Sequence, residues 1–138
     1  MKKTLRKETI AAMKQLPESV KTQADEELTQ RLLELPAFQE AKTLATYLSF
    51  DHEFSTANLI KAALQLGKRV CVPRTYAQGR MEFVEYDPDI LEKTRFGLLE
   101  PNEKGRVVDQ SEIDLIHVPG VVFQSKGYRI GYGGGYYD

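Results

Sequence analysis

The residues most suited to chemistry lie at the end of the sequence, in Gly127–Asp138. Gly131 and Gly133–Gly135 remove the Cβ atom at four of five positions, and backbone N–H groups of such a segment can turn toward an anion. Arg129 adds a guanidinium whose donors match the geometry of phosphate. Asp138 offers a carboxylate that suits Mg²⁺ when phosphate oxygens complete the coordination. The segment therefore predicts a site for a phosphorylated ligand.

This glycine-rich segment fits neither of two common nucleotide-binding motifs. Tyr136 stands where the dinucleotide-binding fingerprint has its last glycine, and no Gly-Lys-Ser/Thr follows as in a P-loop. A glycine–tyrosine tail without a binding role is the alternative that composition leaves open. Arg129 and Asp138 at the two ends of the segment favour the phosphate site.

Other basic residues are weaker candidates for phosphate binding. Lys2 and Arg6 are four residues apart, which puts them on one face of a helix. A solvated basic N-terminus is the competing interpretation. Arg74 follows Val72-Pro73 at an expected strand end, a favoured position for ligand contacts, although a surface arginine after proline is also common.

A further group of candidates follows the first expected strand. Phe50 and Phe54 could line a pocket for a flat ring, and Glu53 could accept hydrogen bonds from ring N–H groups. In the alternative interpretation, Asp51 and Ser55 cap the next helix while Glu53 points to water. The residues alone support both interpretations equally.

The remaining reactive side chains predict no metal or covalent chemistry. His52 and His117 have no neighbour at metal-ligand spacing, and His117 is expected inside a strand as a hydrogen-bonded core residue. Cys71 is expected to be buried in a strand and inert. No serine or cysteine has an evident base partner, so a covalent intermediate is not expected.

The elements that position these residues begin with two expected helices. Apolar residues recur at three- and four-residue spacing before Pro17, and Pro36 ends a second helix. Because both helices are polar on one side, each is expected to cover another layer with its apolar side. The apolar stripe of the second helix consists of Val20, Ala24, Leu28, Leu32 and Leu35.

The period then changes to that of strands. Thr43–Leu48 is expected to be a buried strand, and a helix capped by Ser55 follows and stops at Gly67. Arg69–Val72, closed by Pro73, completes a βαβ unit with a right-handed crossover.

The second half of the chain contains two more expected strands and a loop-rich excursion between them. In chain order these segments are Met81–Tyr86, the excursion Leu91–Val108, and Asp114–Val118, with Val121–Phe123 just after the last strand. The sequence contains no internal repeat, so residues 1–138 are expected to form a single α/β domain.

Composition excludes several classes of protein. The chain of 138 residues has 19 basic and 20 acidic residues, so bulk charge does not predict nucleic-acid binding. A single cysteine suits a reducing compartment. No apolar run approaches the roughly 20 residues of a membrane span, and a cytoplasmic protein is expected.

The sequence resembles the 5-formyltetrahydrofolate cyclo-ligase family along its whole length. The last matching segment, placed after a Val-Pro-Gly strand end, is the most specific. The resemblance is carried by Lys2–Arg6, Leu48–Glu53, Val72–Arg74, Asp114–Gly120 and Arg129–Asp138.

This resemblance implies a doubly wound α/β fold, with a mostly parallel sheet and helices on both faces, like that of sugar-phosphate isomerases and CoA transferases. It also implies an ATP- and Mg²⁺-dependent reaction that converts 5-formyltetrahydrofolate to 5,10-methenyltetrahydrofolate and releases ADP and phosphate. Phosphorylation of the formyl oxygen, followed by attack of N10, needs no enzyme nucleophile. Small molecules are the only partners implied. The competing interpretation is a related nucleotide- or phosphate-binding module without catalysis.

The resemblance also assigns roles to residues by their position in the motifs. Lys2, Arg129 and Tyr136 are the implied catalytic residues, and Asp138 is the implied ligand of Mg²⁺. Leu48 and Glu53, with the stretch Tyr132, Gly133, Gly134, Gly135 and Tyr136, are implied in folate binding. ATP binding is implied for Lys2, Lys3, Thr4, Leu5, Arg6, Arg129, Ile130, Gly131, Tyr132, Gly133, Gly134, Gly135, Tyr136 and Tyr137. Adding Arg74 to this site is our own inference from its strand-end position.

The sequence departs from the family pattern at two places. Gln124 stands where members often have aspartate after the phenylalanine of the Val-Pro-Gly segment, so no metal or capping role is expected there. Members usually continue well past Tyr-Tyr-Asp. We therefore expect that a helix and closing strands, which would follow Asp138, are missing from this chain.

Overall fold

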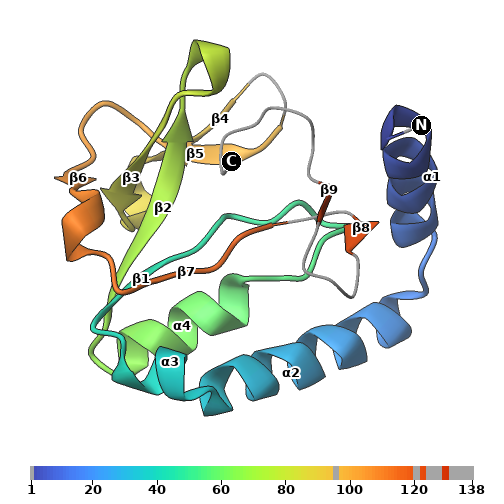
Figure 1. Ribbon diagram of the computed structural model, residues 1–138, viewed down its shortest axis with the longest axis horizontal. Coiled ribbons are helices and arrows are strands. Elements are labelled where there is room, and N and C mark those ends of the chain that lie inside the picture. The colour runs from blue at the N-terminus through green and yellow to red at the C-terminus, as the bar shows by residue number, and fades with distance from the viewer. Residues whose placement is uncertain (1, 95–96, 120–121, 124–128, 131–138) are drawn as a thin grey trace.

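A five-stranded sheet in the order β6-β3-β2-β1-β7 organises the protein (Figure 1). The computed structural model describes residues 2–94, 97–119, 122–123 and 129–130. The strands of the sheet are β1 (Thr43–Ala45), β2 (Arg69–Thr75), β3 (Met81–Glu85), β6 (Val107–Val108) and β7 (Leu115–Ile116).

Four of the five strands point the same way, because β2 and β7 are parallel to β1 while β3 is antiparallel to both β2 and β6. The predicted α/β class with a mostly parallel sheet is therefore confirmed. Two small antiparallel pairs lie outside this sheet. They are β4 (Leu91–Lys93) with β5 (Leu99–Pro101), and β8 (Val122–Phe123) with β9 (Arg129–Ile130).

The first helices form where the apolar spacing predicted them. They are α1 (Lys2–Lys14) and α2 (Glu18–Glu34), followed by the short α3 (Pro36–Glu40). Pro36 ends α2 but also opens α3, because a proline in the first turn of a helix gives up an N–H that would have no intrahelical partner. Figure 1 shows α2, α3 and α4 (Ala57–Gln65) together on one side of the sheet.

The side of α2 that faces the protein differs from the predicted stripe. Val20 and Leu28 are 51% and 46% exposed, whereas Thr29 is buried, and Lys21 forms a 2.6 Å ion pair with Asp25 on the same part-buried side. Helix α2 contacts α3 and α4, and the aliphatic stem of a lysine can cover apolar surface while its charged end stays in water. The expected inward orientation of the whole apolar stripe is therefore wrong.

The core lies on both faces of the central strands. Alternation along β1 sends Leu44 to the helical side and Ala45 to the other, and β2 does the same with Val70 and Cys71. The helical cluster contains Phe38, Leu44, Leu59, Ile60, Ala63 and Val70, and the opposite cluster contains Ala45, Cys71, Phe83 and Val108.

The predicted βαβ unit is confirmed as β1-α4-β2, but three of its boundaries move. Strand β1 ends at Ala45 rather than at Leu48. Thr56, not Ser55, is the residue at the N-terminus of α4, and its hydroxyl donates a 2.6 Å hydrogen bond to the Tyr47 carbonyl. Strand β2 continues through Pro73 to Thr75. Because β1 pairs with β2 only as far as Cys71, the missing N–H of Pro73 removes no bond from that ladder.

A carboxylate fastens β7 to the neighbouring strand. Asp114 Oδ2 accepts hydrogen bonds from the backbone N–H groups of Lys42 and Thr43 at 2.9 and 3.0 Å, and these bonds lower the pKa of Asp114. The contact joins chain segments more than seventy residues apart. Within the described ranges, no helix combines the length and apolar character that a membrane crossing requires.

Candidate functional site

The carboxyl ends of β1 and β7 form the most site-like region of the described structure. After β1 the chain crosses through α4 to β2 on one side, whereas β7 pairs with β1 on the other side. Open α/β sheets place ligands where neighbouring strands diverge in this way, just beyond their carboxyl ends. The residues that follow β1 and β7 are therefore the first candidates for ligand contacts.

His117 follows β7 directly and contacts the segment that follows β1. Its Nδ1 atom lies 3.0 Å from Thr46 Oγ1, and its ring centroid lies 5.1 Å from that of Tyr47 and 5.7 Å from that of Phe54, edge-on to the latter. Burial lowers the pKa of His117, which favours the neutral ring. The predicted hydrogen bond is present, but the residue stands past the strand end rather than inside the strand.

Glu53 is buried at the tip of the segment after β1. It is 5% exposed, and its Oε1 atom accepts a 2.7 Å hydrogen bond from the Phe50 N–H. The interpretation in which Glu53 points to water is therefore wrong. At the base of the segment, the Thr56 N–H donates to Ser49 Oγ at 3.2 Å. Leu48 is partly buried and packs against the helical core cluster.

Phe50 and Phe54 both take part in ring contacts, although with two different histidines. The rings of Phe50 and His52 stack with centroids 5.6 Å apart, while Phe54 contacts His117. Burial lowers the pKa of His52, and the positive charges of Lys14 and Lys21 lower it further. Ring contacts therefore occur on both sides of Glu53 in the chain, at Phe50 before it and at Phe54 after it.

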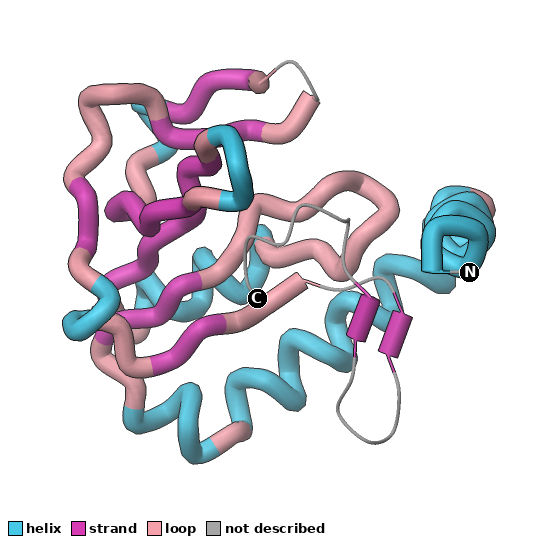
Figure 2. The backbone as a smooth tube through the Cα atoms, turned by 45° about the horizontal axis from the view of Figure 1, so that its top comes forward, coloured by secondary structure: helices cyan, strands magenta, loops and turns pink. Residues whose placement is uncertain are grey.

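The N-terminal helix lies beside the β8–β9 pair. Helix α1 contacts β8, and Phe123 of β8 is in register with Arg129 of β9. Figure 2 shows this pair on the side of the sheet where α1 lies. Lys2, Lys3, Thr4 and Leu5 are exposed on α1, and Arg6 is half-buried. The structure therefore brings the backbone of Arg129–Ile130 close to the helix that carries the predicted N-terminal phosphate ligands.

Several predicted site residues lie outside the described residues. They are Gly131, Tyr132, Gly133, Gly134, Gly135, Tyr136, Tyr137 and Asp138, and Gln124 also lies outside the described residues. In the ranges that the structure does describe, no three histidine, cysteine or acidic side chains gather as a metal site.

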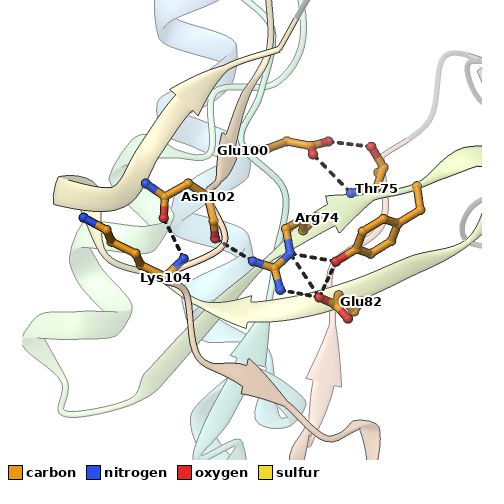
Figure 3. Close-up of polar contacts among 7 residues, drawn as sticks. Arg74, Thr75, Glu82, Glu100, Asn102 and Lys104 are labelled. Carbon is orange, nitrogen blue, oxygen red and sulfur yellow. Dashed lines mark hydrogen bonds and ion pairs between the residues drawn. The ribbon is translucent and has the colours of Figure 1, made fainter.

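Arg74 belongs to a network that joins β2 to β3 and to the segment after β5 (Figure 3). Its Nε atom donates to Glu82 Oε2 and to the Tyr76 hydroxyl, both at 3.0 Å, and its Nη2 atom forms an ion pair with Glu82. Nη1 donates to the Asn102 carbonyl at 2.5 Å. Arg74 hydrogen-bonding lowers the pKa of Glu82. These contacts indicate a structural role, within β2 rather than past its end.

The sequence prediction missed Thr46 as a partner of His117. The sequence pattern places Thr46 in an apolar strand, but its side chain is fully buried and hydrogen-bonded to the imidazole. A buried threonine at a strand end needs a partner for its hydroxyl. The sequence could therefore indicate that Thr46 needs a hydrogen-bond partner. It could not identify that partner as His117, which lies 71 residues away.

The model of the 5-formyltetrahydrofolate cyclo-ligase family matches residues 1–138 of this chain. The 5-formyltetrahydrofolate cyclo-ligase of Haemophilus influenzae is 37% identical over 120 residues, which cover 84% of this chain and 64% of the relative. The cyclo-ligase of Escherichia coli K12 is 37% identical over 112 residues, covering 78% of this chain and 62% of the relative.

Solved structures agree with the sequence comparison. The 5,10-methenyltetrahydrofolate synthetase of Aquifex aeolicus is 31% identical with a TM-score of 0.83, covering 99% of this chain and 69% of that one. The Mycoplasma pneumoniae synthetase, 21% identical with a TM-score of 0.77, supports the fold; the match covers 99% of this chain and 74% of that one. This chain spans about three fifths of the length of the curated relatives. The family match over residues 1–138 shows that the chain belongs to the 5-formyltetrahydrofolate cyclo-ligase family.

Proposed function

We propose that this protein converts 5-formyltetrahydrofolate to 5,10-methenyltetrahydrofolate with ATP, releasing ADP and phosphate. The observation that carries this proposal beyond family membership is the buried Glu53 carboxylate at the carboxyl end of β1. The ionised carboxylate is a hydrogen-bond acceptor only, and its Oε1 atom already accepts from a backbone N–H at this position. Glu53 is thus suited to accept from the N–H groups of a pterin ring.

The chemical problem is that a formamide oxygen is a poor leaving group. Transfer of the γ-phosphoryl group of ATP to that oxygen activates the formyl carbon for attack by N10, and phosphate leaves as the ring closes. The protein then acts by positioning and by stabilising charge. We assign phosphate binding to Lys2, Arg6 and Arg129, and assign Tyr136 to the reacting centre with Lys2 and Arg129.

The remaining assignments divide the two substrates between two regions. Leu48 and Glu53, together with the stretch 132–136, are assigned to folate. The segment 2–6 and the stretch 129–137 are assigned to ATP. The contact between α1 and β8, with β9 paired to β8, supports an ATP site shared by these two regions.

Mg²⁺ is proposed to bind together with ATP. The ion commonly takes one or two protein carboxylates and completes its coordination with phosphate oxygens and water. One protein ligand is therefore enough, and we assign this role to Asp138. When bound, the ion neutralises charge on the phosphates. We expect the reaction to take place in the cytoplasm, where the buried thiol of Cys71 stays reduced.

A spectrophotometric assay on the full-length gene product tests this function. With saturating Mg-ATP and 5-formyltetrahydrofolate, we expect the absorbance of methenyltetrahydrofolate to rise and ATP hydrolysis to depend on the folate. ATP binding without product would instead identify a non-catalytic nucleotide-binding relative. The matched control is the same protein with ADP in place of ATP, which should give no product.

A further inference from the structure

His117 connects two chain segments that meet only in the folded protein. Its backbone N–H donates to the Ala45 carbonyl at 2.8 Å, and its Nδ1 atom lies 3.0 Å from Thr46 Oγ1. Its ring also contacts Phe54, the residue directly after Glu53. His117 therefore links the end of β7 both to the start and to the tip of the segment that follows β1.

The hydrogen bond between Thr46 and His117 has a defined direction. Thr46 is fully buried, and its hydroxyl has no other hydrogen-bond partner among the residues that the structure describes. If Nδ1 carried the proton, the buried threonine hydrogen would lose its acceptor, which is unfavourable. Thr46 therefore donates to Nδ1, and the neutral ring carries its proton on Nε2.

The segment that His117 contacts is closed by its own hydrogen bonds. The Thr56 hydroxyl binds the Tyr47 carbonyl at the base, and Glu53 binds the Phe50 N–H at the tip. These local bonds define the shape of the segment but do not attach it to β7. The Thr46 hydrogen bond and the Phe54 ring contact provide that attachment through His117.

We propose that His117 is a positioning residue for folate binding: held by Thr46, it fixes the segment that carries Glu53 against the end of β7. This inference rests on the proposed function, because it assigns the consequence to the folate substrate. A residue of this kind changes the affinity for the substrate that the segment binds and leaves the other substrate unaffected.

The test uses two substitutions that preserve shape. Thr46→Val removes the hydroxyl, and His117→Phe retains a ring of similar size without Nδ1. Each is expected to raise the KM for 5-formyltetrahydrofolate about three- to tenfold, the size of one lost neutral hydrogen bond, with the KM for ATP unchanged. Because both remove the same bond, the double variant should be no worse than either single variant. Ile116→Val, at an exposed neighbouring position, is the matched control.

A second measurement does not depend on turnover. The chain has two histidines, so the imidazole ¹⁵N spectrum of the ligand-free protein, assigned with a His52→Gln variant, reports the tautomer of His117. We expect a neutral ring with the proton on Nε2, and a shifted signal in Thr46→Val. A His117 signal that is the same in the wild type and in Thr46→Val would overturn the proposal, because it would show that Thr46 does not hold the ring.

The outcomes separate this inference from the proposed function. An active wild type whose variants keep normal KM values, or lose affinity equally for both substrates, overturns the role of His117 alone. If the wild type binds 5-formyltetrahydrofolate in calorimetry without turnover, the proposed function fails while the variants still test the positioning through their Kd values. Absence of both turnover and folate binding overturns both proposals.

Discussion

The carboxylate of Glu53 can be changed without changing its shape, so its charge can be tested separately from its packing. In Glu53→Gln, the side-chain oxygen can still accept from the Phe50 N–H, but the charge that strengthens bonds from a pterin ring is lost. We expect the KM for 5-formyltetrahydrofolate to rise roughly five- to tenfold and the KM for ATP to rise less. Steady-state kinetics with each substrate varied in turn measures this.

The control for Glu53 is Glu103→Gln, which removes a charge at an exposed position outside the candidate site and should leave both constants unchanged. An equal rise of both KM values in Glu53→Gln would contradict the folate assignment.

Arg129 is the residue on which the phosphate assignment depends most. Each charge-assisted hydrogen bond to phosphate contributes roughly 1.5–3 kcal/mol, so Arg129→Ala should lower kcat/KM by about tenfold or more. Arg129→Lys keeps the charge but loses the paired donors and should recover only part of the activity. Arg106→Ala, at an exposed position outside the candidate site, is the comparison variant. If kcat/KM stays unchanged in Arg129→Ala, this residue does not belong to the site.

At the level of elements, the Arg74 network fastens the β2–β3 hairpin and predicts a pH-dependent loss of stability. Arg74 hydrogen-bonding lowers the folded pKa of Glu82 below its unfolded value. The pair therefore stabilises the fold above the unfolded pKa, and this contribution disappears as the pH falls through the folded pKa. We expect Arg74→Gln to lower the free energy of unfolding by about 1–2 kcal/mol at pH 7.

Urea unfolding of the wild type and of Arg74→Gln at pH 7 and pH 3 measures this effect. The difference between the two proteins should shrink in acid, where Glu82 takes up its proton. A difference that is equally large at both values would show that the arginine acts by packing alone.

In the segment between β3 and β6, Gly105 lies in close contact with the side chains of Val84 and Ile90. A Cβ atom at Gly105 would lie 2.3 Å from Val84 Cγ1 and 3.1 Å from Ile90 Cδ1, and Val84 is fully buried in β3. Gly105→Ala should therefore lower the free energy of unfolding by about 1–3 kcal/mol. Lys104→Ala, at an exposed neighbour, should have little effect, and the two urea midpoints provide the test. Equal midpoints for Gly105→Ala and the wild type would contradict the packing.

At the level of the whole molecule, Cys71 reports on global unfolding. The single thiol of the chain is 1% exposed in the central strand β2, and burial raises its pKa to about 11. Since thiolate is the reactive form, a disulfide reagent at pH 8 should label the native protein at least about a hundredfold more slowly than the urea-unfolded protein. Rapid stoichiometric labelling under native conditions would show that β2 is accessible.

Sequence patterns predicted the elements better than their contacts. The helix spacing, the βαβ unit and the buried strand around Cys71 are local features, and they are confirmed. The outward turn of the Val20–Leu28 stripe was not predictable, because a period shows which residues share a face but not what that face meets. Strand β2 also continues past Pro73, where it pairs with β3, and this pairing is not visible in the local sequence.

In the candidate site, too, the sequence identified residues but not their contacts. The residue types leave open whether Glu53 accepts hydrogen bonds from a ring or points to water, because the Phe50 N–H that binds it belongs to a turn whose geometry they do not specify. The contacts of His117 with Thr46 depend on the pairing of β1 with β7 and could not be seen in either segment alone. The roles of Lys2, Arg129 and the terminal glycine–tyrosine stretch stay predictions.

The position of β1 between β2 and β7 also has a consequence for biosynthesis. As the chain leaves the ribosome, β2 follows β1 after about two dozen residues, but Leu115 and Asp114, which complete the other edge of β1, emerge some seventy residues later. Until then β1 has no partner on that side, and an unpaired strand edge is a place where another chain can pair. We infer that this edge is where the growing chain most needs protection from pairing with other chains.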